Sequence, residues 1–308
     1  MLEPSGCLRP RRAERSRRGR ETSEHADTDV ADVASVSRFS ERSAGKTFSS
    51  APTTDARQVN SSYHHRVAVL ADLEGSTSSQ LQSMSLGVII PVGSTEQHGP
   101  HLPLGTDTRI ASEVARNITA RLTGGPDDPQ LQWVMAPAIA YGDSGEHQSF
   151  PGTISIGTDA LSSLLLEYGR SATCWAQRLL FINGHGGNIT ALRRAVGLLR
   201  SEGRDAGWCP CTVAGADAHA GHAETSLLLH ISPADVLADR WRAGNAAPLS
   251  DLLPSMRRGG VAAVSELGVL GDPTTATAAE GERMLAEMVD DCLCRVRRWA
   301  PTGDGLLT

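Results

Sequence analysis

The sequence has no long apolar run, no excess of basic residues and few cysteines, and each absence excludes a class of protein. No apolar stretch approaches the roughly 18 residues that a membrane-spanning helix needs. The formal net charge of −6 gives no general argument for a nucleic-acid partner. The N-terminus is basic, but no apolar segment follows it, so we expect no secretory signal, no membrane partner and a cytoplasmic location.

The six cysteines include two C-x-C pairs, Cys209–Cys211 and Cys292–Cys294, a spacing that could indicate metal binding. The second pair falls in a helical pattern, where residues i and i+2 point in different directions. We therefore expect reduced, mostly buried thiols rather than a metal site or a disulfide framework.

Composition divides the 308 residues near position 60. Residues 1–60 are rich in Arg and Ser and have few large apolar side chains, so they are predicted to be either a disordered tail or an extension of the gene model. Residues 61–302 are long enough to bury the core of a single domain, and residues 303–308 are predicted to be a short tail.

Strand and helix patterns alternate from residue 87 onward, which predicts an α/β fold with a mainly parallel sheet and helices on both faces. The predicted strands are 87–92, 133–140, 179–182 and 208–213. The predicted helices are 107–122, 158–177, 188–201, 222–231 and 277–299. In such sheets ligands bind beyond the carboxyl ends of the strands, so the loops there are the place to look for chemistry.

The loop after the first predicted strand contains a possible metal site. Glu96 and His98 are two positions apart, so in extended backbone their side chains project to the same side. Asp107 begins the next helix, where its short carboxylate can point back over the loop. A Glu/His/Asp set suits Zn²⁺, Fe²⁺ or Mn²⁺, although Glu-x-His alone is more often a polar loop that binds its own backbone.

Two further clusters follow later strands. In Asn183–Asn188 three glycines surround His185, which favours a ligating histidine over a phosphate-binding loop, because no Lys-Ser/Thr follows the glycines. The stretch His219–Ser226 adds two histidines and Glu224 at the start of a predicted helix. Three His/carboxylate clusters at the ends of strands in one sheet together predict a metal site.

Five stretches of the chain resemble the motifs of the creatininase (creatinine amidohydrolase) family. They are Gly93–Asp107, Tyr141–Thr153, Asn183–Asn188, His219–Ser226 and Gly268–Pro273. The resemblance spans about residues 62–300. It implies the three-layer creatininase-like α/β fold and a single metallohydrolase domain over residues 61–302.

This resemblance implies two divalent metal ions bridged by a carboxylate and a water. The ligands that it implies are Glu96, His98, Asp107 and His185. Asp107 takes the bridging position. Creatininase itself has a ligating Glu two residues after the loop histidine, where this chain has Gly187, and Glu224 is the nearest candidate replacement. The ions are expected to be Zn²⁺ or Fe²⁺, with Mn²⁺ as an alternative, because the donor set does not select among them.

The resemblance also assigns catalytic and substrate-binding residues. His219 falls at the position of the family's catalytic histidine, and Ser144 and His147 lie in a segment that lines the substrate pocket of relatives. We expect the bridging water to attack an amide carbonyl and His219 to donate a proton to the leaving amine. Glu224 would either ligate a metal or shuttle protons.

Two later stretches, Val196–Cys211 and Pro254–Glu266, resemble the branch of the family that acts in mycofactocin biosynthesis. Members of this branch remove the C-terminal Val-Tyr dipeptide from a modified ribosomal precursor peptide, which is therefore the expected substrate. Hydrolysis of a small cyclic amide such as creatinine is one alternative, and a non-catalytic metal-binding assembly protein is another. The resemblance also implies a homo-oligomer.

Overall fold

Four strands form one parallel sheet in the computed structural model, which describes residues 72–82, 84–123 and 131–308. The strands are β1 (Leu86–Val92), β2 (Gln132–Met135), β3 (Arg178–Asn183) and β4 (Ala206–Pro210). Their order in the sheet is β2-β1-β3-β4, and all three pairings are parallel. Parallel neighbours need a crossover connection, and a helix lies between each strand and the next along the chain.

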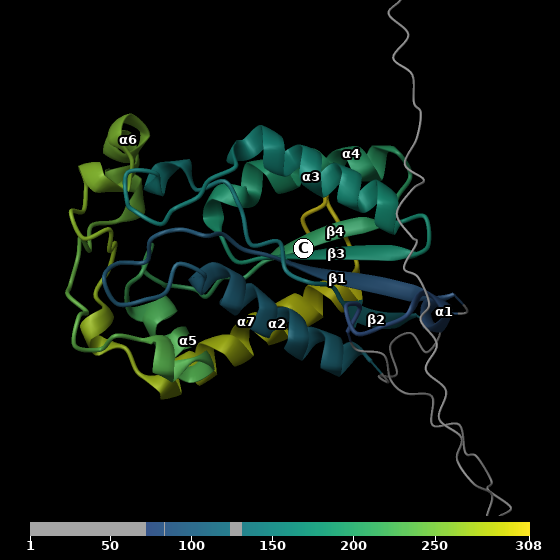
Figure 1. The fold of residues 1–308 in the computed structure, drawn as a ribbon, viewed down its shortest axis with the longest axis horizontal. Coiled ribbons are helices and arrows are strands. Elements are labelled where there is room, and N and C mark those ends of the chain that lie inside the picture. The colour runs from purple at the N-terminus through teal and green to yellow at the C-terminus, as the bar shows by residue number, and fades with distance from the viewer. Residues whose placement is uncertain (1–71, 83, 124–130) are drawn as a thin grey trace, which may run out of the picture. The chain divides into compact units, whose positions relative to one another are not determined.

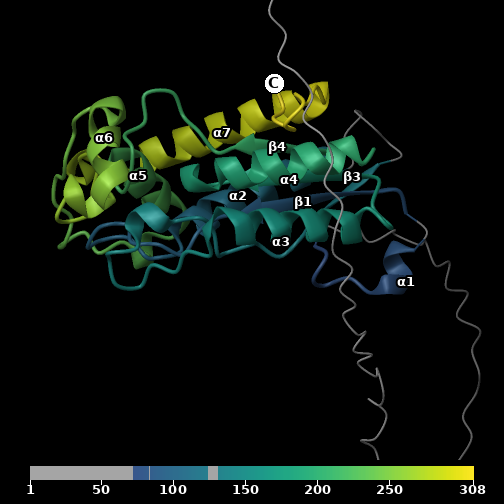
Figure 2. The ribbon, with the colours of Figure 1, turned by 90° about the horizontal axis from the view of Figure 1, so that it is seen from above.

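Helices cover both faces of the sheet (Figures 1 and 2). The helices over one face are α2 (Thr106–Leu122), α5 (His222–Ile231) and α7 (Ala278–Arg298), and those over the other are α3 (Gly157–Ala172) and α4 (Ile189–Ser201). Helices α1 (Ser78–Leu81) and α6 (Leu249–Gly259) lie beyond the ends of the sheet. Side chains alternate along a strand, so Val88 and Ile90 pack with α3 and α4, whereas Ile89 packs with α2, α5 and α7. The predicted three-layer α/β architecture is therefore confirmed.

Two predicted strands differ from the structure by more than one residue at an end, and two helices, α1 and α6, were not predicted. The strand predicted at 133–140 ends at Met135, and Pro137, which cannot donate a hydrogen bond to a neighbouring strand, follows it. The strand predicted at 208–213 is β4, which begins and ends earlier. Helix α6 contains Pro254, and a proline inside a helix hides the helical pattern of a sequence.

The structure describes the C-terminal end of the chain but not the first 71 residues. The predicted tail of residues 1–60 lies outside the described residues. Residues 303–308, predicted to be a short tail, lie against β4, because the Trp208 N–H donates a hydrogen bond to the Gly305 carbonyl at 2.9 Å and Leu307 is fully buried. Within the described part of the chain the cysteines are free thiols, of which Cys174 and Cys294 are exposed, and no helix is long and apolar enough to cross a membrane.

Loops from the carboxyl ends of β1 and β3 run side by side at one edge of the sheet. The Gly184 N–H donates to the Val92 carbonyl at 2.8 Å, and Gly184 lies so close to α2 that a β-carbon there would be 2.4 Å from the Asp107 carbonyl oxygen. Only glycine permits this approach. It brings the loop that carries His185 against the first turn of α2.

Candidate metal centre

Asp107, in the first turn of α2, lies between two buried histidines from different loops. Its Oδ1 is 3.1 Å from His98 Nε2, and its Oδ2 is 3.3 Å from His185 Nδ1. His98 follows β1 and His185 follows β3, so the sheet and α2 together determine this spacing. Each oxygen of one carboxylate therefore faces a different imidazole, an arrangement suited to a carboxylate that bridges two cations.

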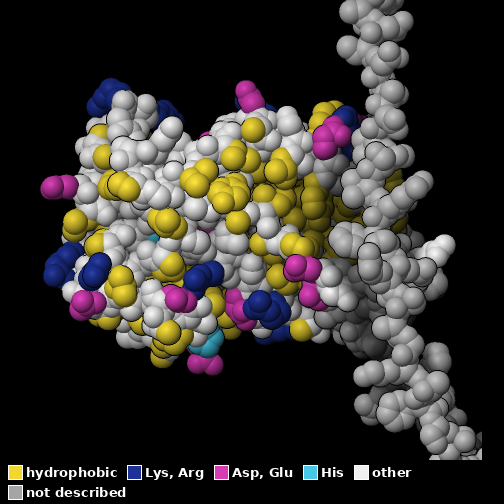
Figure 3. All heavy atoms as spheres, viewed as in Figure 1, with side chains coloured by type: hydrophobic (Ala, Val, Ile, Leu, Met, Phe, Trp, Pro, Cys, Tyr) yellow, Lys and Arg dark blue, Asp and Glu magenta, His cyan; other side chains and the backbone are white. Residues whose placement is uncertain are grey.

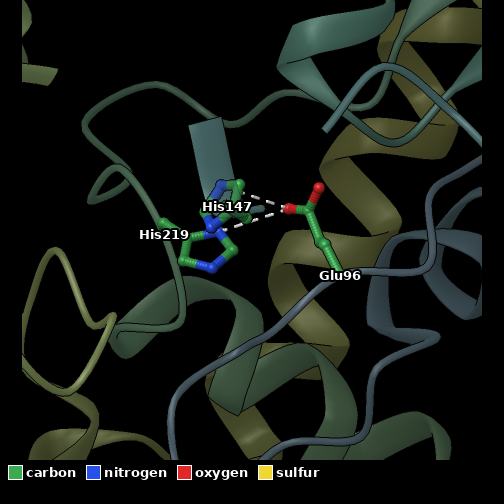
Figure 4. Close-up of side chains that lie close together, drawn as sticks. All are labelled: Glu96, His147 and His219. Carbon is green, nitrogen blue, oxygen red and sulfur yellow. Dashed lines mark ion pairs between the residues drawn. The ribbon is translucent and has the colours of Figure 1, made fainter. Parts of the chain in front are cut away.

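Glu96 lies at the centre of the remaining groups, with a fully buried side chain. Its Oε2 is 3.2 Å from His185 Nε2. Its Oε1 is 3.5 Å from His147 Nε2 and 3.7 Å from His219 Nδ1, and Figure 4 shows this carboxylate pointing toward both rings. Glu96 thus contacts histidines from three separate loops.

Glu224, in the first turn of α5, faces the same nitrogen of His98 as Asp107 does. Its Oε2 is 3.8 Å from His98 Nε2 and 3.9 Å from His219 Nδ1. The same oxygen accepts a hydrogen bond of 2.6 Å from the Ala220 N–H, and Ala220 has a left-handed backbone with φ of 51°. The turn before α5 therefore aims Glu224 at His98 rather than at His185.

Three groups of side chains bring their ligand atoms within 4.8 Å of one another. The groups are Glu96–His98–Asp107, Glu96–His147–His219 and His98–His219–Glu224. Both oxygens of Glu96 and Oδ2 of Asp107 are buried without a hydrogen-bond partner among the described residues. Buried polar atoms are nearly always satisfied, so these orphaned carboxylate oxygens fit divalent cations well.

Burial and charge divide the four histidines into two pairs. Burial opposes protonation of His98 and His185, but the neighbouring carboxylates outweigh it and raise the pKa of each to about 10. Burial lowers the pKa of His147 to about 3, and it also lowers the pKa of His219 well below its usual value. One pair is thus cationic at neutral pH in the metal-free protein, and the other pair is neutral.

Burial and neighbouring charges also determine the pKa values of the three carboxylates. Burial raises the pKa of Glu96 to about 7, and burial also raises the pKa of Glu224. Burial acts in the same direction on Asp107, but His98 and His185 lower the pKa of Asp107 well below its usual value. Protons on two histidines therefore balance the carboxylates in the metal-free site, and cations that bind there must displace those protons.

Seven of the eight predicted site residues lie together in the structure, although not all in the predicted relation, and Ser144 lies beside them. Glu224, the candidate replacement for the carboxylate that Gly187 lacks, faces His98 at 3.8 Å, whereas Gly187 follows His185. Glu146, which the sequence analysis missed, has its Oε1 3.6 Å from His185 Nε2. A β-carbon on Gly187 would meet that same oxygen at 3.1 Å. The signal that could have pointed to Glu146 is its position in the sequence, directly before the predicted site residue His147.

The other predicted residues support the site or lie beside it. The hydroxyl of Ser144 is buried and hydrogen-bonded to Ser94, outside the three groups. His101 is buried and hydrogen-bonded through Nε2 to Thr225 at 2.9 Å, which ties the loop after β1 to α5. Little histidine is visible on the face drawn in Figure 3, in agreement with a buried site.

A cavity of about 860 Å³ opens beside the cluster. Glu224 lies at its wall, together with Gly184 and Gly186 of the loop around His185. Asp217 and Arg283 also line it. This volume falls within the range of about 300–1,000 Å³ that is typical of ligand pockets.

Comparison with known proteins identifies relatives along most of the chain. The creatininase family model, described as creatinine amidohydrolase, matches residues 74–296. The chain is 72% identical over 252 residues to a mycofactocin precursor peptide peptidase of Mycobacterium tuberculosis, and the match covers 81% of this chain and 100% of that protein. Identity to the protein of the same name from Mycolicibacterium smegmatis is 64% over 250 residues, with coverage of 81% and 100%.

A solved structure shares the fold at lower identity. A mutant creatininase of the Zn-Zn type is 24% identical, covers 76% of this chain and 99% of that chain, and gives a TM-score of 0.61.

Proposed function

The chain belongs to the creatininase family, and we propose that it is a two-metal peptidase that removes the C-terminal Val-Tyr dipeptide from the modified mycofactocin precursor peptide. The observation that carries this proposal is Asp107, whose two oxygens face His98 and His185 within a buried carboxylate cluster. The 72% identity over the whole length of a peptidase of that name supports the substrate.

The donor set is proposed to hold two divalent ions. The proposed ligands are Glu96, His98, Asp107, His185 and Glu224, with Asp107 as the bridge. Mixed histidine and carboxylate donors suit Zn²⁺ and Fe²⁺, and Mn²⁺ is a third candidate. When bound, such ions lower the pKa of a water and polarise an amide carbonyl.

His219 is proposed to move the proton during hydrolysis. Because burial keeps this imidazole neutral, its Nδ1 can accept a proton from the attacking water and return it to the leaving amine. Glu224, 3.9 Å from that nitrogen, is placed either to ligate or to share the proton. Ser144 and His147 are proposed to contact the substrate. Neither a serine nor a cysteine nucleophile is needed.

The test is cleavage of the modified precursor peptide, with a synthetic peptide ending in Gly-Val-Tyr as a second arm, followed by mass spectrometry. Activity should disappear on chelation and return with one or more of Zn²⁺, Fe²⁺ and Mn²⁺. Hydrolysis of creatinine but of neither peptide would favour the cyclic-amide alternative. Bound metal without hydrolysis of any of the three would favour the non-catalytic alternative.

Homo-oligomeric assembly and a cytoplasmic location stay predictions. Light scattering on the purified protein tests the first.

A further inference from the structure

Gln97 lies between Glu96 and His98 in sequence, and its buried carboxamide has a single possible orientation. Its Oε1 accepts a hydrogen bond of 2.9 Å from the Gly99 N–H, and its Nε2 donates to the Gly268 carbonyl at 3.1 Å. An N–H can only donate and a carbonyl can only accept, so the oxygen and nitrogen of this amide cannot be exchanged.

Gly268 makes room for this amide. A β-carbon at Gly268 would be 2.0 Å from Gln97 Oε1, and its φ of +76° also favours glycine. The amide is therefore held by residues from two distant parts of the chain.

This orientation determines which nitrogen of His147 carries the hydrogen. Gln97 Nε2 is 2.8 Å from His147 Nδ1. Because the amide nitrogen only donates, His147 Nδ1 must accept, and its hydrogen must lie on Nε2. That N–H is directed into the site, where Nε2 is 3.5 Å from Glu96 Oε1.

The backbone of the same residue determines the opposite arrangement for His219. His219 Nε2 is 2.8 Å from the Gln97 carbonyl oxygen, which only accepts, so this nitrogen carries the hydrogen. His219 Nδ1 then presents a lone pair toward Glu96 Oε1 at 3.7 Å. The 3.1 Å contact between His219 Nε2 and Gln97 Nε2 joins two donors and is not a hydrogen bond in this arrangement.

The two rings drawn in Figure 4 therefore face one carboxylate with opposite chemistry. An imidazole N–H cannot ligate a cation, whereas a lone pair can ligate or accept a proton. The group Glu96–His147–His219 is for this reason not a third metal site, although its atoms lie close enough for one.

We propose that Gln97 is a positioning residue that holds His147 as a hydrogen-bond donor to the oxygen of the scissile amide and His219 as a proton acceptor. This inference rests on the proposed peptidase function. As water adds to the carbonyl carbon, the electron pair of the C=O bond moves to oxygen, which accepts a hydrogen bond from His147 Nε2–H without taking its proton. His219 Nδ1 takes one proton of the water and delivers it to the amine nitrogen as the C–N bond breaks.

The first test is Gln97→Glu, which keeps the shape of the side chain and replaces its donor with an acceptor. Solid-state NMR of ¹⁵N-histidine in the zinc-loaded protein, with the His147 signals assigned by loss in His147→Gln, should show the His147 hydrogen move from Nε2 to Nδ1. We expect kcat to fall about 10- to 100-fold with two ions still bound, the usual effect of losing an orienting partner. The matched control is Gln177→Glu at an exposed position, which should change neither the position of the His147 hydrogen nor kcat.

The second test distinguishes a donor from a ligand at His147. His147→Gln places an amide N–H near the former Nε2, so it should retain more activity than His147→Ala, and both should bind two ions. Loss of an ion from His147→Ala, or a hydrogen on Nδ1 of His147 in the unmutated zinc-loaded protein, would overturn the proposal. The tautomer and metal measurements use no substrate, so a failure of the peptidase assay would leave their outcome readable.

Discussion

The four histidines of the site form two pairs that differ in charge and in what holds them. His98 and His185 face the two oxygens of Asp107, and the carboxylates around them raise the pKa of each to about 10. His147 and His219 are held by Gln97, and burial keeps them neutral. One site thus separates histidines suited to hold cations from histidines suited to handle protons and hydrogen bonds. The Asp107 oxygens lie 3.1 and 3.3 Å from the first pair, whereas Glu96 Oε1 lies 3.5 and 3.7 Å from the second.

The strongest way to break this comparison is Asp107→Ala, which removes the group shared by the first pair. Both ions should be lost and peptide hydrolysis abolished, because each of the two histidines loses its facing carboxylate oxygen. Metal analysis and the cleavage assay measure the result. The exposed Asp239→Ala is the control, and an Asp107→Ala protein with full metal content and rate would refute the two-metal site.

His219→Asn tests the second pair. If His219 moves protons and does not ligate, kcat should fall by about 10²- to 10⁴-fold while both ions remain bound. The control is the exposed His230→Asn. A loss of one ion would instead assign His219 to the ligands. That outcome is geometrically possible, because His219 belongs to two of the three groups whose ligand atoms lie within 4.8 Å of one another.

Smaller effects are expected from Glu224, which faces His98, and from Glu146, which faces His185. Glu224→Gln should weaken one ion by at least the 10- to 100-fold typical of an orienting partner, because Glu224 is anchored by the Ala220 N–H. Glu146→Gln should weaken the other ion by less, since Glu146 Oε1 is 3.6 Å from His185 and its side chain is 32% exposed. Titration with a competing chelator measures both, with the exposed Glu266→Gln as control. Equal metal affinity in all three variants would exclude both carboxylates as ligands.

The smallest effect concerns pH and the metal-free protein. Folding raises the pKa of His98 and His185 from 6.5 to about 10, so the folded state binds more protons than the unfolded state between these values. This contribution to stability is complete below about pH 6.5 and is lost as pH rises toward about 10. The melting temperature of the chelated protein should therefore fall over this range more than that of the metal-loaded protein. Parallel declines would argue against charged histidines in the metal-free site.

Much of the fold followed from local patterns. The apolar run that became β1 and the helical periodicity of α2, α5 and α7 depend on neighbouring residues, so the sequence predicted them closely. The end of β2 and the presence of α6 were missed, because each depends on how a proline is accommodated by its surroundings. Helix α1 was missed as well, because its four residues are too few to show a helical period. Most of the proposed ligands could likewise be named from the sequence, since they lie in short motifs at strand ends.

By itself the sequence determined the α/β alternation and the residues that gather at the carboxyl edge of the sheet. Only the tertiary structure decided the charge and the hydrogen-bonding role of each of these side chains. Whether a histidine is cationic or neutral, and which nitrogen carries its hydrogen, depends on groups brought together from distant positions, such as the amide of Gln97 and the Gly268 carbonyl, 171 residues apart. The same holds for Glu146 beside His185, because charge and hydrogen bonding act through space and leave no local pattern in the sequence.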